Sequence, residues 1–502
     1  MIICKHCHSE KLQRRGTLPS GAARFACTNC GKWMTDPLSS EPDIDQSIVK
    51  SNIKKASQNK RLVVTSAQNG TPVNKDFLAT LLNYCEHNNA QLLTVPYRYR
   101  NPNSLFREDE DVWASEIQEY LIDEKIHLHN GLVLLGNIKT QPTAVNPLTG
   151  LEGFTSTESI IVGHPKIALE SIATRQGDMA KLVMSTGSVT LPNYTDSKAG
   201  AKGEHHHSQG AVVVELDGDV FHVRHLHAKD GVINDLDKKY TPTTVEYESA
   251  EAVVLGDLHF PFTDGDAIKG TKKLLDQVNP KYAVYHDCID SFSISHHHQK
   301  QPFVKYAKVK YGMESVQEEL EETLNLVRDM TPTNSEAILV ASNHQDHIRR
   351  WIDEADWKSD PVNAEFYLKT ALYMLQNTYM TSGGPVTPDP FAYWAEGFKC
   401  LGYDESFQVC GVELGLHGDL GGNGSRGSPV GLSRIGTKAI VGHYHRPVWK
   451  DGLASVGTLS SLGMHYANGP SSWLQSNIVL FKSGRWQHVH IINGKYGKSQ
   501  GR

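Results

Sequence analysis

The sequence predicts an α/β protein with a small cysteine-rich module at its N-terminus. Short apolar runs alternate with amphipathic helical patterns twice along the chain, and two Cys-x-x-Cys pairs stand at its start. The length of 502 residues is enough for about three domains. We therefore expect a module over residues 1–36, a linker over 37–60, an α/β middle domain over 61–247 and a C-terminal domain over 248–502.

The middle domain is predicted from apolar strand-like runs separated by helical patterns. The predicted strands are residues 62–64, 92–95 and 132–135, and the predicted helices are residues 75–84 and 112–122. Residues 37–60, which precede this domain, are polar and aperiodic, as is typical of a linker. The domain's role is not indicated. Histidine-rich spots at 127–129, 204–207 and 225–227 could form a further metal site, although surface histidines are the commoner explanation.

The C-terminal domain is predicted from a second alternation of the same kind. Its expected strands are residues 252–255, 282–285 and 337–340, and its expected helices are residues 264–278 and 304–330. In the longer helix, apolar residues recur every three or four positions, so one face should pack in the core. These residues are Val309, Met313, Val316, Leu320, Leu324 and Val327.

Composition and charge exclude some classes of protein. The chain is 39% hydrophobic and contains no run of about 18 apolar residues, so we expect no membrane-spanning helix. Charged residues and cysteines stand where a signal peptide would be apolar, which favours a cytoplasmic protein. The net charge of -6 is unevenly spread, because residues 1–35 carry six Lys/Arg and one acid, and residues 482–502 carry five Lys/Arg and no acid. Basic ends can follow a phosphate backbone, or they can serve solubility alone.

The cysteine pairs in the module are Cys4, Cys7, Cys27 and Cys30. Two such pairs typically converge in a tetrahedral zinc site, whose ion supplies folding free energy that a short segment cannot obtain by burial. The run CKHCHSEKLQRRGTLPSGAARFACTNCGKWMT resembles the zinc ribbons of transposase-type and other DNA-associated proteins. The resemblance implies one structural zinc ion, with either DNA contact or a purely structural role for the ribbon.

Five clusters of metal-binding side chains follow apolar runs in the C-terminal domain. In chain order they are Asp257 and His259; His286, Asp287 and Asp290; Asn343 and His344; His417 and Asp419; and His443 and His445. One histidine after a strand is usually structural, but five clusters in series are typical of a shared site at one edge of a sheet. Carboxylate, imidazole and amide ligands together suit Mn, Fe or Zn better than Ca.

The order and spacing of these clusters resemble the calcineurin-like metallophosphoesterase superfamily, whose motifs are D-x-H, G-D-x-x-D, G-N-H-[ED], H and G-H-x-H. The resemblance covers about residues 251–466. It implies a β-sandwich flanked by helices and two divalent ions that activate a water molecule. Mn is the most favoured ion, with Fe, Zn or Mg as alternatives. The implied ligands are Asp257, His259, Asp287 and His445 for one ion, and Asp287, Asn343, His417 and His443 for the other.

The resemblance also implies that His344 is the general acid that protonates the leaving oxygen. His286, Ser342 and Gln345 depart from the motifs, but none replaces an implied ligand, so they affect only the surroundings of the ions. Asp290 could either orient a ligand histidine or cap a turn.

The metal-binding motifs indicate phosphoester hydrolysis without naming the substrate. The Asp-Arg-Gly sequence that marks protein phosphatases is absent, which excludes that class. The zinc ribbon, the basic ends and the basic or flexible segments beside the motifs together favour DNA. Arg349, Arg350 and Arg426 are predicted to contact its phosphates.

The layout is similar to that of the early DNA-degrading nucleases of large virulent phages. This similarity implies a metal-dependent deoxyribonuclease, acting as an endonuclease or an exonuclease, in the cytoplasm of a host cell. A small-molecule phosphoesterase and a non-catalytic metal-containing DNA-binding protein are the alternatives. No membrane partner is expected, and the oligomeric state is not indicated.

Overall fold

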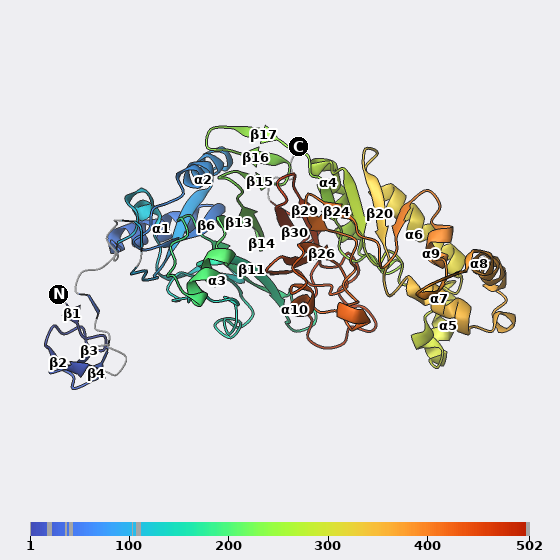
Figure 1. Cartoon of the computed structure of the whole chain (residues 1–502), viewed down its shortest axis with the longest axis horizontal. Helices are drawn as coiled ribbons and strands as arrows, with labels where there is room; N and C mark the ends of the chain where they lie inside the picture. Colours follow the sequence, from blue (N-terminus) through green and yellow to red (C-terminus); the bar gives the residue numbers. More distant parts are fainter. Residues whose placement is uncertain are drawn as a thin grey trace.

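The computed structural model describes residues 2–17, 23–35, 38–39, 44–102, 104–106 and 112–497. It is a mixed α/β protein, as the sequence predicts. Strands run through the middle of the body, and helices gather toward its two ends (Figure 1). Among the described residues, no helix combines the length and the apolar character needed to cross a membrane.

The N-terminal module is a small antiparallel sheet of β2 (Leu12–Thr17), β3 (Ala23–Cys27) and β4 (Trp33–Met34). A second short pair, β1 (Ile2–Ile3) with β5 (Leu38–Ser39), lies next to it in the chain. Cys4, Cys27 and Met34 form the buried centre of this module, which has few other apolar residues to bury.

The prediction of a linker over residues 37–60 is wrong for its second half, while residues 37 and 40–43 lie outside the described part of the chain. Helix α1 (Gln46–Gln58) begins at Asp45, whose carboxylate accepts a hydrogen bond from Ser47 N (2.8 Å). The helix buries Val49 and Ala56 together with Asn52, whose Nδ2 donates to the carbonyls of Glu119 and Leu121 (both 3.0 Å). Because the polar residue Asn52 stands on the buried face, the sequence lacks the apolar periodicity that would have predicted this helix.

The middle of the chain forms a four-stranded sheet. In spatial order its strands are β14 (Val220–His227), β13 (Gly210–Asp217), β6 (Arg61–Gln68) and β7 (Gln91–Tyr97). The parallel strands β6 and β7 are joined by α2 (Lys75–Asn88), and α3 (Lys198–His206) precedes β13. The helix expected over 112–122 is only a short 3-10 helix, η1 (Ser115–Tyr120), because Trp113 Nε1 bonds the carbonyl of Ala67 (3.0 Å) and holds the preceding chain against β6. A small sheet of β15 (Ile233–Asp235), β16 (Lys238–Tyr240) and β17 (Val245–Tyr247) follows.

A ten-stranded sheet crosses the boundary that the sequence places at residue 247. Its strands, in spatial order, are β24 (Gln408–Val409), β25 (Val412–Glu413), β26 (Ala439–Val441), β28 (Leu453–Ser455), β27 (Val448–Lys450), β11 (His164–Ile172), β12 (Lys181–Gly187), β10 (Ser159–Val162), β9 (Leu132–Leu135) and β8 (Lys125–His129). The two regions meet where β11 pairs with β27, with Leu169 opposite Trp449. The middle and C-terminal regions therefore share one sheet, which the sequence did not indicate.

A six-stranded sheet completes the C-terminal region. Its spatial order is β23 (Lys399–Leu401), β20 (Glu336–Val340), β19 (Tyr282–Tyr285), β18 (Ala252–Val254), β29 (Ser476–Leu480) and β30 (Trp486–His490). Side chains alternate across this sheet. Val254 packs in one hydrophobic cluster with Ile440 of the ten-stranded sheet, whereas Val253 packs in another with Leu274 of α4 (Gly265–Val278). The six-stranded sheet thus has the other sheet on one face and helices on the opposite face.

The helix expected over residues 304–330 is two helices, α5 (Pro302–Tyr311) and α6 (Val316–Met330). Gly312 ends α5 in the left-handed region with φ 67°, and the Ser315 hydroxyl caps α6 by accepting from Glu318 N (3.2 Å). The predicted apolar face is confirmed in α6 but wrong for Val309, which is 66% exposed on α5.

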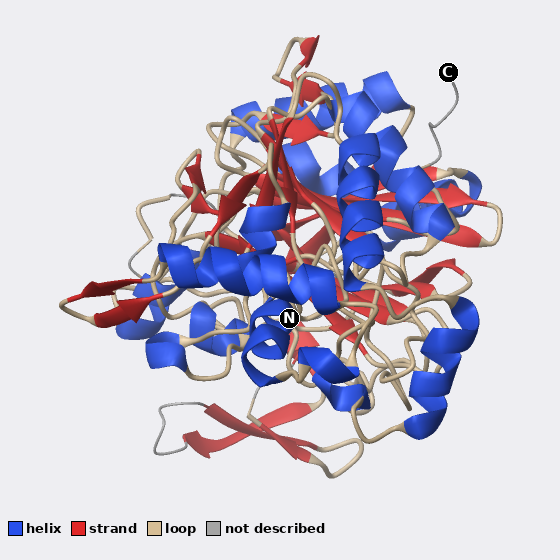
Figure 2. Cartoon of the chain, turned by 90° about the vertical axis from the view of Figure 1, so that its right-hand side faces the viewer, coloured by secondary structure: helices blue, strands red, loops and turns tan. Residues whose placement is uncertain are grey.

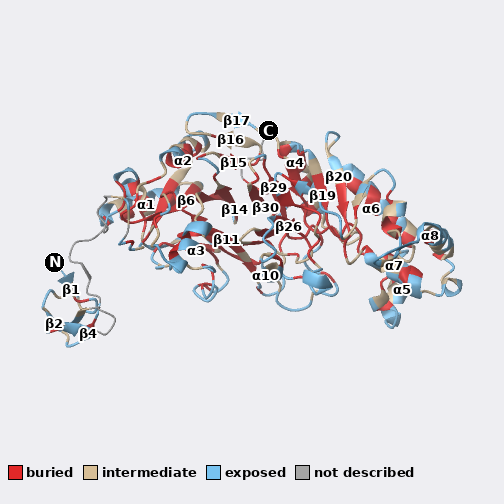
Figure 3. Cartoon of the chain, viewed as in Figure 1, coloured by how far each residue is buried: buried red, intermediate tan, exposed pale blue. Residues whose placement is uncertain are grey.

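Further helices cover the end of the C-terminal region that lies to the right in Figure 1. They are η2 (His296–His298), α7 (Asp346–Glu354), η3 (Trp357–Ser359), α8 (Ala364–Asn377) and α9 (Pro390–Trp394), with a hairpin of β21 (Tyr379–Thr381) and β22 (Gly384–Val386) before α9; η4 (Gly422–Gly424) and α10 (Pro429–Leu432) follow later in the chain. Figure 2, viewed from that side, shows helices around the central strands, and Figure 3 shows that burial concentrates in the strands of the body.

Candidate metal centre

The predicted metal ligands follow strands that end at one edge of the two sheets. Strands β18, β19 and β20 are parallel neighbours, so the segments after them, with Asp257, Asp287 and Asn343, emerge side by side. His417 comes after β25, and His443 and His445 come directly after β26, which is parallel to β25. The topology therefore gathers all seven predicted ligands, although they are spread over almost 190 residues of sequence.

Four of these side chains form the first group. Asp257, His259, Asp287 and His445 each offer one ligand atom, and these atoms all lie within 4.8 Å of one another. His445 Nε2 is 3.2 Å from Asp257 Oδ2 and 2.8 Å from His259 Nε2. Two imidazole nitrogens at such a separation, with carboxylates beside them, form a donor set that suits a divalent ion.

The second group shares Asp287 with the first. Asp287, His417 and His443 again offer ligand atoms within 4.8 Å of one another. His417 Nε2 lies 3.1 Å from Asp287 Oδ2, and Asn343 Oδ1 lies 3.2 Å from His417 Nε2 and 3.1 Å from His443 Nδ1. Asp287 thus stands between two adjacent donor sets, as expected of a residue that bridges two ions.

Burial leaves three of the four oxygens of the central carboxylates without a hydrogen bond from the described residues. Asp257 is 0% and Asp287 1% exposed, and both oxygens of Asp257 and Oδ1 of Asp287 have no hydrogen-bond partner among the described residues. Burial, together with the charge of Asp287, raises the pKa of Asp257 well above its ordinary value. Burial would also raise the pKa of Asp287, but the charges of His417 and His344 outweigh it and hold that pKa well below its ordinary value. Divalent cations would relieve the repulsion between the two carboxylates, so the residues fit such ions.

The backbone holds these side chains in a conformation that is rare for residues other than glycine. Positive φ angles occur at His259 (50°), Asp287 (38°), His443 (72°) and His445 (54°). Such strain is concentrated at functional sites, where the surrounding structure enforces it. A Cβ at Gly442, between these segments, would press against Asp257 Oδ1 and lie 2.8 Å from the Cβ of His286, so no larger residue fits there.

His344 and Asp290 lie beside the first group. His344 Nδ1 is 2.9 Å from the carbonyl oxygen of Asp290, and since a carbonyl only accepts, Nδ1 carries the proton and Nε2 is left for other partners. Asp290 Oδ2 is 3.2 Å from Nδ1 of His259 and 3.6 Å from Nδ1 of His344. Of the two roles that the sequence left open for Asp290, the geometry supports the orientation of a ligand histidine.

A cavity of about 480 Å³ opens beside His344 and Asn343. Its other lining residues include His297 and His298, which closely follow the second motif, and His347, His465 and Tyr466, which the motifs did not identify. His465 and Tyr466 lie in an irregular segment after the last motif, and no sequence pattern marks them. The cavity gives a ligand room next to the metal-binding groups.

The three predicted phosphate-contacting arginines do not line this cavity. Arg349 on α7 donates to Thr387 Oγ1 and to the carbonyl of Pro388 (Nη2 to O, 3.1 Å). Arg350 pairs with Glu354 one turn along the same helix (2.9 Å), and Arg426 is exposed in the loop after His417. Their contact with a substrate remains a prediction.

The four module cysteines converge as their spacing predicts. Their sulfur atoms lie within 4.8 Å of one another, with Cys4 Sγ 3.6 Å from Cys30 Sγ and Cys7 Sγ 3.6 Å from Cys27 Sγ. A tetrahedral zinc site with Zn–S bonds of about 2.3 Å has sulfur atoms about 3.8 Å apart. The arrangement therefore fits one zinc ion.

The histidine-rich spots of the middle region are held by ordinary hydrogen bonds. His207 contacts the Thr190 carbonyl and the Tyr194 hydroxyl (both 2.9 Å), and His225 contacts the Ser185 carbonyl (2.9 Å). His127 pairs with Glu158 (2.9 Å). His225 is buried rather than at the surface, and no convergent metal-ligand group involves these spots in the described part of the chain.

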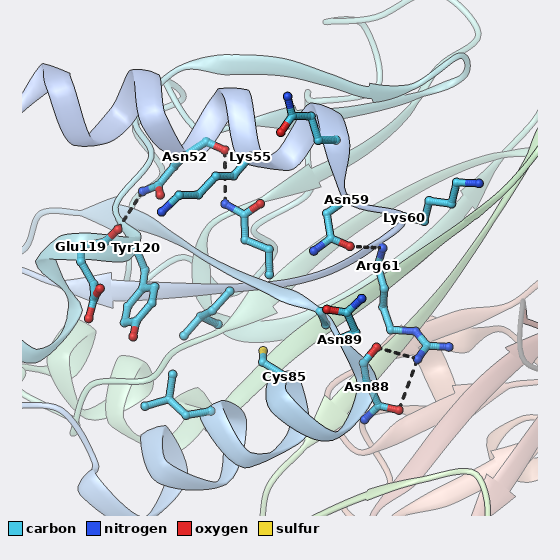
Figure 4. A pocket seen from close by; sticks show the side chains of 15 residues that line it. Asn52, Lys55, Asn59, Lys60, Arg61, Cys85, Asn88, Asn89, Glu119 and Tyr120 are labelled. Carbon is cyan, nitrogen blue, oxygen red and sulfur yellow. Dashed lines mark hydrogen bonds between the residues drawn. The ribbon is translucent and has the colours of Figure 1, made fainter.

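A larger cavity, of about 910 Å³, lies away from the metal centre, between α1, α2 and the starts of β6 and β7. Figure 4 shows its lining of amides and cations, in which Arg61 Nη1 donates to the Asn88 carbonyl (3.0 Å) and Gln91 Nε2 to the Asn52 carbonyl (3.2 Å). Much of its polar lining is thus bonded within the protein, and no residue of the metal centre takes part in it.

Comparisons with known proteins place the chain among phage proteins. No protein-family model matches it. Among solved structures, Vps29 of Chaetomium thermophilum is similar with a TM-score of 0.19 and 13% identity, over 37% of this chain and 97% of that one. Among curated proteins, Protein A1 of Escherichia phage T5 is 32% identical over 490 residues, which cover 89% of this chain and 85% of that protein. The chain therefore belongs to the family of the phage T5 Protein A1.

Proposed function

We propose that the chain is a metal-dependent DNA nuclease whose C-terminal region is a calcineurin-like metallophosphoesterase domain. The observation that carries this proposal is the pair of buried donor sets that share Asp287, with His344 beside them. The motif order, the strand-end placement and the packing of two sheets with helices outside all agree with that superfamily. The relationship to a phage protein supports action in the cytoplasm of an infected cell.

In this proposal, Asp257, His259, Asp287 and His445 hold one divalent ion, and Asp287, Asn343, His417 and His443 hold the other. Two such ions supply an activated water and neutralise charge on the attacked phosphate. His344 holds the proton for the leaving oxygen on Nε2, because Nδ1 is committed to the Asp290 carbonyl (2.9 Å). Asp290 fixes the orientation of both His259 and His344.

DNA is favoured as the substrate by the N-terminal module. Its residues Arg14, Arg15 and Arg24 are exposed, and the Arg24 guanidinium lies 4.4 Å from the ring centre of Trp33, which is itself 51% exposed. Exposed cations beside an aromatic ring can contact phosphates and bases. If they do, cleavage should weaken as salt rises, and the triple variant Arg14→Ala/Arg15→Ala/Arg24→Ala should show a shallower salt dependence.

A small-molecule phosphoesterase is the second candidate. The cavity beside His344, at about 480 Å³, is within the range of about 300–1,000 Å³ that holds small ligands. Such an enzyme would turn over bis-p-nitrophenyl phosphate or a cyclic nucleotide and leave DNA intact.

The test uses supercoiled plasmid and linear duplex DNA with Mn²⁺, followed on a gel. The wild type should cleave DNA, and His344→Ala should be slower by about 10²- to 10⁴-fold, because a general acid contributes that much. His205→Ala is the matched control, since His205 is exposed on α3 and belongs to no metal-binding group. Intact DNA with turnover of a small ester would favour the second candidate, and cleavage by His344→Ala at the wild-type rate would contradict the proposed role of that residue.

A further inference from the structure

Three histidines outside the metal centre converge on one point. His296 and His297 lie on η2, and His347 lies in the first turn of α7. One ring nitrogen of each lies within 4.8 Å of the other two. The ring centre of His296 is 3.8 Å from that of His297 and 4.9 Å from that of His347. Two elements separated by about 50 residues of sequence thus bring three imidazoles together.

The protein itself leaves part of this cluster unsatisfied. Nδ1 of His296 and Nδ1 of His347 are buried and have no hydrogen-bond partner among the described residues. A buried polar atom without a partner is unfavourable, and a metal ion bound to the ring would supply the missing partner.

The position of the cluster relates it to the metal centre. His297 and His347 line the same cavity of about 480 Å³ as Asn343 and His344. The ring centres of His344 and His347 are 5.1 Å apart. The cluster shares no side chain with the two donor sets around Asp287, so an ion in it would be additional to those two.

We propose that His296, His297 and His347 bind a further divalent cation, Zn²⁺, on the wall of the cavity. Three imidazoles suit zinc, and a site with three protein ligands leaves its fourth position open. That position would take a phosphate oxygen of the bound strand next to the one being cleaved. This role of the ion rests on the proposed nuclease function, whereas the metal site itself does not.

The experiment measures zinc directly. The full-length wild type, His297→Ala, His347→Ala and His205→Ala are equilibrated with Zn²⁺, freed of excess by gel filtration and analysed for metal content. His205 is the matched control because it also neighbours another histidine, with ring centres 5.0 Å apart, yet belongs to no convergent group. The two cluster variants should each lose about one zinc ion per chain, and the control should lose none. The near-ultraviolet circular dichroism of each variant shows whether it is folded.

A second readout does not depend on the variants. Crystals of the wild type grown with Zn²⁺ should show an anomalous difference peak among the three rings. Unchanged zinc content in both folded variants, or no anomalous peak there, would overturn the site. If zinc binds at these rings but the protein does not cleave DNA, the site stands and its role toward DNA falls. If the protein cleaves DNA and no zinc binds at these rings, the proposed function stands and this inference falls.

Discussion

Asp290→Asn removes one negative charge from the side of the metal centre without changing the shape of the side chain. Asp290 Oδ2 lies 3.2 Å from His259 Nδ1, and the side chain is 5% exposed. The asparagine can still accept that hydrogen bond through its amide oxygen, so only the charge is lost.

The magnitude follows from that difference. A hydrogen bond to a charged group contributes about 1.5–3 kcal/mol and a neutral one about 0.5–1.5 kcal/mol. The loss is therefore about 1–1.5 kcal/mol, which corresponds to about tenfold weaker binding of the ion held by His259. Removal of a residue that orients a metal ligand commonly has an effect of about 10- to 100-fold, which agrees.

The assay is a titration of the metal-free protein with Mn²⁺, with the free ion followed by electron paramagnetic resonance. The control is Asp264→Asn, which makes the same charge change at the start of α4, where Asp264 Oδ1 accepts from Ala267 N (2.9 Å). Asparagine caps a helix as well as aspartate, so this variant should bind Mn²⁺ as the wild type does. If Asp290→Asn binds Mn²⁺ within about twofold of the wild type, the orienting role of Asp290 is refuted.

Three further predictions concern a buried ion-pair network and the loop at the metal centre. Arg224→Ala should lower the free energy of unfolding by about 3–5 kcal/mol in urea titrations, because it removes a buried cation that bonds Asp235 (2.8 Å) and Glu215 (2.7 Å). The control Lys272→Ala, at an exposed ion pair, should lower it by at most about 1 kcal/mol. Burial would raise the pKa values of Glu215 and Asp235, but Arg224 outweighs it and holds both pKa values below their ordinary 4.5 and 3.8. The contribution of these two carboxylates to stability should therefore be complete above about pH 5 and be lost on acidification below those values. Thermal unfolding measured against pH would show this loss. Gly442→Ala should abolish Mn²⁺ binding at the centre, because its Cβ has no room beside the metal-site carboxylate; binding at wild-type strength would show that the loop can move aside.

The sequence predicted the convergence of these side chains because its signals are local. Each ligand motif directly follows an apolar strand, and parallel neighbours such as β18, β19 and β20 must end at the same edge. The sequence pattern and the expected parallel topology together therefore predicted that Asp257, Asp287 and Asn343 lie close to one another. The convergence of the four cysteines was predicted for a similar reason, since the spacing within each pair defines one turn.

The errors arose where local and tertiary signals disagree. The break between α5 and α6 was present in the sequence as Gly312 and the Ser315-x-x-Glu318 capping pattern, but the continuing apolar periodicity masked it. Helix α1 was not predicted because its buried face includes Asn52, whose partners are the distant carbonyls of Glu119 and Leu121 at the end of η1.

The shared sheet and the far wall of the cavity carry no local signal. The pairing of Leu169 with Trp449 joins strands far apart in the chain, and neither strand shows which partner it will take. His347 is near His344 because it follows three residues later in the same turn, but His465 reaches the cavity only because an irregular segment folds over the end of the sheet. Features of this kind depend on tertiary packing, so a single sequence does not show them.

The most direct test of the central claim is the electron paramagnetic resonance spectrum of the protein loaded with two equivalents of Mn²⁺. Two ions that share the Asp287 carboxylate, about 3.5–4 Å apart, should give the spectrum of a spin-coupled pair. Asp287→Asn should replace it with the spectrum of isolated ions or of free Mn²⁺. A wild-type spectrum that shows only isolated Mn²⁺ would contradict the account, because the two donor sets would then not form one binuclear centre.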